Sequence, residues 1–151
     1  MNIDADSVFS DAQAVTVTAI SANVMDANHS ANLLKDLGIN GEPVYLFVTC
    51  TEAFATATSV TVTLETDSTA NLATSATVHA TSGAIGIAAL TVGAVAWKLQ
   101  LPEAATYERF VGLRYTIGGA TATAGRLTAF LVGNIPGYRA YANAADTYTG
   151  R

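Results

Sequence analysis

The chain of 151 residues carries a formal net charge of −5 from 12 acidic and 7 basic residues. The basic residues are scattered between Lys35 and Arg151, so the electrostatic footprint of a nucleic-acid-binding protein is missing. The one cysteine, Cys50, can form no intrachain disulfide, and no segment is long and apolar enough to span a bilayer. So few charges favour a protein that packs against neighbours over a free monomer.

The first half of the chain predicts two strands joined by a long connection. The first strand is Ala12–Val24, although its two faces differ little. Within the connection, Ser30–Gly38 predicts one short helix, because a serine can cap it, its leucines share one face and a glycine can end it. The next strand, Val44–Thr51, is apolar on both faces. That pattern predicts a central strand that is covered on each side.

The second half of the chain alternates apolar and polar residues with a period of two, which is typical of half-buried strands. In Thr58–Thr66 the inward side chains are those of Val60, Val62 and Leu64. A polar turn at Asp67–Asn71 precedes a short strand, and three longer strands follow a glycine-rich region. These four predicted strands are Thr74–His79, Val92–Leu101, Arg109–Ile117 and Thr121–Val132.

Strands at spacings of about ten residues, with a single helical connection, are typical of a sandwich, a barrel or a jelly roll. A parallel sheet is disfavoured because helices do not alternate with the strands. We therefore predict an all-β jelly-roll or β-sandwich domain of about eight antiparallel strands over residues 1–133.

The segment after the last strand, residues 134–151, differs in kind and predicts a C-terminal arm or tail. It has no periodic core face, so one interpretation is a frayed terminus. The other is an arm that docks on a neighbouring subunit, because tyrosine and arginine are enriched at the centres of interfaces. Deleting the segment should then weaken assembly without unfolding the domain. Its candidate interface residues are Tyr138, Arg139, Tyr141, Tyr148 and Arg151.

Catalytic and metal-binding patterns are not apparent in the sequence. The two histidines, His29 and His79, stand in no known motif, and there is no G-x-S-x-G nucleophile elbow. Glu103 and Glu108 flank a turn, where carboxylates usually face water. No cysteine cluster, histidine pair or acidic calcium loop is present. We expect no enzyme activity, no cofactor and no metal site.

Several segments, taken in order, resemble the capsid cement, or decoration, proteins of short-tailed phages of the Bordetella phage type. They are DAQAVTVTAISANVMD, GEPVYLFV, TVTLETD and LPEAATYERFVGLRYTIGGATATAGRLTAFLV, and they extend from Asp11 to Val132. The resemblance implies a jelly roll that is made in the bacterial host cytoplasm and added to the outside of an icosahedral virion. There it would clamp neighbouring major capsid protein subunits as a symmetric oligomer, without catalytic residues or a cofactor. A homodimer is the first expectation for this oligomer and a trimer is the second.

Two other function classes stay open. A carbohydrate- or receptor-binding module would need a platform of exposed aromatic residues, whereas Trp97 is in phase with Val95 and Leu99 and is predicted to lie in the core. A β-sandwich enzyme is disfavoured by the scarcity of histidines and acids. Three residues in the outward phase of their strands are candidates for contacts with the shell or a partner subunit, or for covering a second sheet: Phe110, Arg114 and Phe130.

Overall fold

The computed structural model describes residues 7–27, 37, 43–73, 75–102 and 106–133. These residues form nine strands and one short 3-10 turn, η2 (Ile87–Ala89). The strands are β1 (Val8–Ala14), β2 (Ala19–Ile20), β3 (Met25–Asp26), β4 (Tyr45–Ala55), β5 (Ser59–Asp67), β6 (Thr77–Gly86), β7 (Val95–Gln100), β8 (Phe110–Gly118) and β9 (Ala124–Val132).

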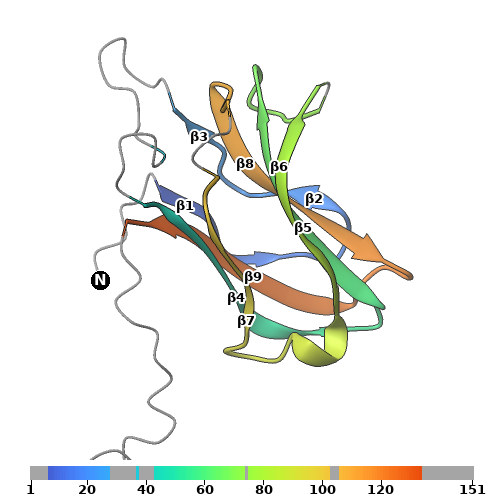
Figure 1. Cartoon of the computed structure of the whole chain (residues 1–151). Helices are drawn as coiled ribbons and strands as arrows, with labels where there is room; N and C mark the ends of the chain where they lie inside the picture. Colours follow the sequence, from blue (N-terminus) through green and yellow to red (C-terminus); the bar gives the residue numbers. More distant parts are fainter. Residues whose placement is uncertain (1–6, 28–36, 38–42, 74, 103–105, 134–151) are drawn as a thin grey trace, which may run out of the picture.

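The strands build two antiparallel sheets that pack face to face (Figure 1). One sheet has the order β1-β9-β4-β7; the other has the order β2-β8-β5-β6, and β3 also pairs with β8. Counted as one interrupted strand, β2 and β3 complete four nested pairs: β1 with β9, β2/β3 with β8, β4 with β7, and β5 with β6. This nesting of early strands with late strands is the jelly-roll arrangement, which confirms the predicted fold class.

The core between the sheets follows the predicted alternation. Val60, Val62 and Leu64 of β5 are buried against apolar residues of β4, β8 and β9. Each such side chain contributes roughly 1.5–3 kcal/mol when it leaves water. Across the core, the hydroxyl groups of Tyr115 in β8 and Ser10 in β1 are 2.7 Å apart, which joins the two sheets by a hydrogen bond. Burial raises the pKa of Tyr115 to about 12, so the phenol stays neutral.

The predicted first strand, Ala12–Val24, is wrong, because this stretch divides into the end of β1 in one sheet and the short strand β2 in the other. Ala12 has a φ of 43° within an irregular part of β1. The side-chain amide of Gln13 then accepts a hydrogen bond from the Ala22 N–H and donates one to the Ile20 carbonyl. These bonds replace strand pairing where the chain crosses between the sheets.

Other boundaries also differ from the sequence-based expectation. The strand predicted at Thr74–His79 lies instead at Thr77–Gly86 and continues through Gly83, whose φ of +69° marks a bulge. Trp97 is half-buried and packs against the core, while its neighbour Val95 is exposed. The predicted helix at 30–38 and the segment 134–151 lie outside the described residues, apart from Leu37, which is buried in the core.

Candidate interaction surface

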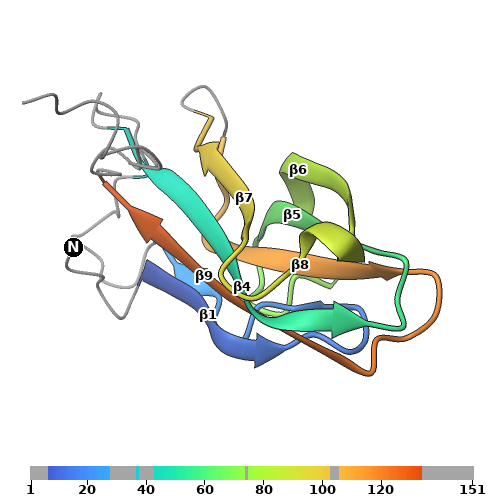
Figure 2. The same ribbon diagram turned by 90° about the horizontal axis from the view of Figure 1, so that it is seen from below.

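One end of the sandwich is built entirely from uncharged residues. Four connections meet there, at the end opposite to the β5–β6 loop (Figures 1 and 2). We call this surface the uncharged end and define it as residues 15–19, 53–59, 83–95 and 116–125. All of these positions hold alanine, threonine, glycine, serine, valine, isoleucine, leucine or phenylalanine. The ion pair between Arg126 and Glu52, with an N–O distance of 2.8 Å, marks its border.

Backbone hydrogen bonds between the four connections hold the uncharged end in one shape. The Thr58 N–H donates to the Gly118 carbonyl at 2.9 Å, and the Ile87 N–H donates to the Thr58 carbonyl at 3.3 Å. The Ala122 N–H donates to the Thr16 carbonyl at 2.9 Å. Beneath them, Leu90 is buried and anchors the η2 turn in the core. The loops therefore form one pre-organised surface, which lowers the entropy cost of binding.

The uncharged end exposes apolar side chains to solvent. Val92 is 70% exposed and Val17 is 54% exposed, although they belong to connections far apart in the sequence. Depletion of charge together with exposed apolar area is typical of a surface that packs against another protein. Nothing on this surface titrates near neutral pH, so its chemistry is limited to packing and hydrogen bonding.

A second apolar cluster lies on the outer face of the sheet β1-β9-β4-β7, away from the core. We call it the outer cluster; it comprises Val8, Tyr45, Phe47, Phe130 and Val132. The rings of Phe47 and Phe130 pack with their centroids 5.6 Å apart. Phe130 therefore does point outward, as predicted, but its side chain is buried. The apolar pattern of Val44–Thr51 on both faces predicted that both faces of this strand would be covered, and Phe47 on its outer face is indeed buried.

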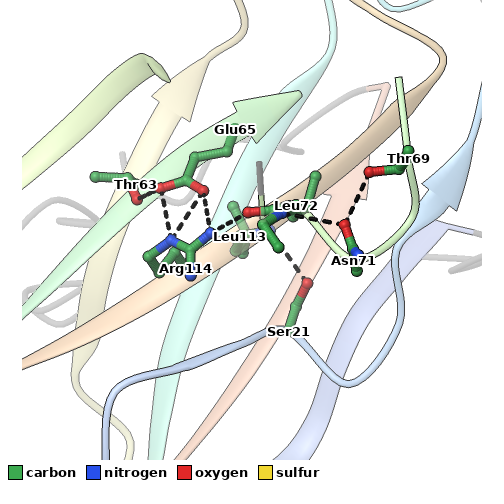
Figure 3. Close-up of polar contacts among 9 residues, drawn as sticks. Ser21, Thr63, Glu65, Thr69, Asn71, Leu72, Leu113 and Arg114 are labelled. Carbon is green, nitrogen blue, oxygen red and sulfur yellow. Dashed lines mark hydrogen bonds and ion pairs between the residues drawn. The ribbon is translucent and has the colours of Figure 1, made fainter. Parts of the chain in front are cut away.

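Arg114 is a structural residue of the other sheet. Its guanidinium pairs with the Glu65 carboxylate at 2.9 Å and also donates to the Leu72 carbonyl (Figure 3). The Glu65 side chain is only 5% exposed, and the Thr63 hydroxyl also donates to it at 2.7 Å. Arg114 thus fixes the β5–β6 loop over the outer face of the sheet, where Leu72 is buried next to Gly112.

Two other predicted interface residues, Phe110 and Arg114, are not brought together with Phe130. Phe110 is half-buried on the outer face of the second sheet, where the guanidinium carbon of Arg109 lies 4.9 Å from its ring centroid. Phe110 and Arg114 therefore lie on the opposite side of the sandwich from Phe130. Tyr138, Arg139, Tyr141, Tyr148 and Arg151 fall outside the described residues.

Among the residues that the structure describes, no three histidine, cysteine, aspartate or glutamate side chains group to hold a metal ion. In the same part of the chain, no helix has the length and apolarity to cross a membrane. Cys50 is buried, and desolvation raises the pKa of its thiol, which leaves it protonated and a weak nucleophile.

His79 packs at the sheet end opposite the uncharged end. Its Nε2 lies 2.7 Å from the Thr66 hydroxyl, and its ring centroid lies 4.7 Å from that of Tyr107. Desolvation lowers the pKa of His79 below its usual 6.5, and the nearby Glu108 carboxylate offsets this only in part.

The depressed pKa of His79 predicts a loss of stability in mild acid. Below pH 6.5 the unfolded chain binds a proton that the folded chain resists, so the free energy of unfolding should fall as the pH drops from about 7 to about 5. Thermal melts of wild-type protein and of His79→Gln across this range measure the effect. The substitution should flatten the pH dependence; an unchanged slope would show that other groups cause it.

Comparison with known proteins gives one family. A family model described as Bbp16 matches residues 9–131. This range takes in at least part of every strand described above. No curated protein matches the chain.

Proposed function

Because the chain belongs to the Bbp16 family, we propose that it is a structural phage protein that binds the outer surface of an icosahedral capsid and cements neighbouring major capsid protein subunits. The observation that carries the proposal is the family match itself, since it spans the jelly roll and the family name suggests a Bordetella phage protein. Jelly rolls are common in viral capsid proteins. The ordered segments between Asp11 and Val132 that resemble phage cement proteins add support.

The uncharged end is the surface that we assign to the capsid contact. A cement protein must add buried area across subunit junctions, and a rigid surface without charges does so without desolvating ions. Repetition over the shell makes individually modest contacts collectively strong. The protein would act there as a symmetric oligomer on the outside of the virion, and a dimer is favoured over a trimer. The proposal requires no cofactor, nucleic acid or membrane.

A carbohydrate- or receptor-binding role receives less support from the surface. Sugar-binding sites commonly stack aromatic rings on the ligand, whereas the large apolar side chains exposed among the described residues are four valines. They are Val17, Val78, Val92 and Val95. Trp97 is half-buried against the core, so it offers no open platform.

Charged substitutions at the uncharged end test the proposal. In Val17→Glu and Val92→Glu, binding would bury an unpaired carboxylate, so affinity for capsids that lack the protein should fall roughly 100-fold. Val78→Glu is the matched control, because Val78 is 55% exposed but lies on β6 opposite Glu65, away from this end. Co-sedimentation with capsids measures the bound fraction.

The possible outcomes distinguish the cement function itself from the assignment of the uncharged end as the capsid contact. Wild-type protein that fails to bind capsids at all would overturn the cement function. Wild-type binding that Val17→Glu and Val92→Glu leave intact would keep the function but exclude the uncharged end as the contact. Loss of binding in Val78→Glu as well would point to a non-specific effect of added charge.

A further inference from the structure

The connection between β4 and β5 contains a threonine in a backbone conformation that side chains rarely adopt. Thr56 has a φ of 75°, in the left-handed region. This region is unfavourable for a β-branched residue, because the branched Cβ crowds the backbone, whereas glycine enters it freely. Only residues 56–58 lie between β4 of one sheet and β5 of the other, so a sharp turn is needed there. The turn explains the left-handed backbone, but a glycine would make it with less strain.

Two other residues with a side chain have a positive φ in the described part of the chain, and the fold accounts for both. Leu72, with a φ of 49°, buries its side chain next to Gly112. Ala12, with a φ of 43°, lies in the irregular part of β1, where its N–H donates to the Thr128 hydroxyl at 2.9 Å. The Thr56 side chain is exposed instead. Burial in the core therefore does not offset the strain at Thr56.

The hydroxyl group of Thr56 meets that of Thr123, which belongs to the connection between β8 and β9. The two oxygens are 2.7 Å apart, and both side chains are exposed. The two connections lie side by side at the uncharged end (Figures 1 and 2). The main chain already joins them, because the Thr123 N–H donates to the Ala55 carbonyl at 3.1 Å. An exposed pair of hydroxyl groups adds little to this link, since water can replace either partner.

The Thr56–Thr123 pair keeps hydrogen-bonding capacity for a partner. One hydroxyl donates to the other, so the second hydroxyl proton and several lone pairs stay available. The Thr18 hydroxyl of the same end serves the fold instead, because it accepts a hydrogen bond from the Ile117 N–H at 3.1 Å. A surface without charges can fix the orientation of a bound protein only through shape and directional hydrogen bonds.

We propose that the Thr56–Thr123 pair is the polar anchor of the capsid contact and donates its free proton to a main-chain carbonyl on the capsid surface. This inference rests on the proposed cement function and names the residues that orient the protein on the shell. An uncharged acceptor fits, because the uncharged end holds no cation to compensate a carboxylate. The exposed side chains of Val17 and Val92 supply apolar area at the same end. The strained backbone of Thr56 is then retained for binding, as is common at recognition sites.

Thr56→Gly tests the anchor, because it removes the backbone strain and the hydroxyl group together. The melting temperature should stay at the wild-type value or rise by up to about 4 °C, since relief of the strain offsets the freedom that glycine adds to the unfolded chain. The affinity for capsids that lack the protein should fall about tenfold in co-sedimentation. A melting temperature clearly below that of the wild-type protein would overturn the proposal, because Thr56 would then serve the fold.

Three further variants separate the hydroxyl groups from the shape of the surface. Thr123→Val removes one hydroxyl and keeps the shape of the side chain, so it should also weaken capsid binding about tenfold. Thr56→Ser keeps the hydroxyl and should bind like the wild-type protein. Thr121→Val is the matched control, because Thr121 is exposed in the same connection as Thr123. This control should keep the wild-type affinity.

The binding results distinguish the anchor from the cement function. Capsid binding by the wild-type protein that Thr56→Gly and Thr123→Val leave unchanged would overturn the anchor alone. Equal losses in Thr121→Val and Thr123→Val would also overturn it, because the effect would then not be specific to the pair. Wild-type protein that does not bind capsids would overturn the cement function and the anchor together.

Discussion

Arg114→Met should destabilise the fold by about 2–4 kcal/mol, because it leaves the buried Glu65 carboxylate without its cation. Removing one partner of a fully buried pair costs roughly 3–5 kcal/mol. The expected cost is lower here, since 30% of the Arg114 side chain reaches solvent. The substitution also removes the donor to the Leu72 carbonyl and so releases the β5–β6 loop. Chemical denaturation with urea measures the change.

A double variant separates the ion pair from packing. Arg114→Met/Glu65→Met removes both charges, so it should recover most of the stability that Arg114→Met loses. Arg114→Lys keeps the charge but not the planar fork, and it should fall in between. If Arg114→Met unfolds at the wild-type denaturant concentration, then the ion pair of Arg114 with Glu65 does not stabilise the fold.

The strand pattern identified the fold because it is a local property. Alternation in Thr58–Thr66 fixed which side chains of β5 enter the core, and the apolar double face of Val44–Thr51 identified β4 as a central strand. The spacing of the strands was then consistent with only a sandwich, a barrel or a jelly roll. The first strand failed because its pairing changes sheets near Gln13, and that change depends on side-chain hydrogen bonds to residues seven and nine positions away.

The uncharged end could not be located from the sequence, because the fold assembles it from four connections that are distant in the sequence. The scarcity of charge was visible, and no Asp, Glu, Lys or Arg occurs between Asp67 and Lys98. Only the jelly-roll order brings this stretch beside the loops at 15–19, 53–59 and 116–125. The alternation of apolar and polar residues likewise could not show that Arg114 and Phe130 lie in different environments. An outward position in a strand does not reveal which sheet that strand joins or which residues pack over the side chain.

Gly125→Ala should destabilise the protein by about 3–5 kcal/mol, because it disturbs the packing of Gly125 against Phe54 beneath the uncharged end. Gly125 has a φ of +141°, a conformation that side chains rarely adopt, and an added Cβ would lie 2.3 Å from the buried Phe54 ring. Backbone strain and overpacking therefore add. Gly86→Ala is the matched control, because its backbone is extended and its Cβ meets nothing within 4 Å.

A second substitution shows which of the two costs dominates at Gly125. Phe54→Leu should remove part of the overlap, so Gly125→Ala should cost less in that background than in the wild-type protein. The same cost in both backgrounds would assign the whole effect to the backbone. Melting temperatures of the four proteins, wild type, both single variants and the double variant, decide between them. Wild-type stability in Gly125→Ala would contradict the close contact between Gly125 of β9 and Phe54. It would also contradict the inference that this contact helps to hold the loops of the uncharged end in one shape.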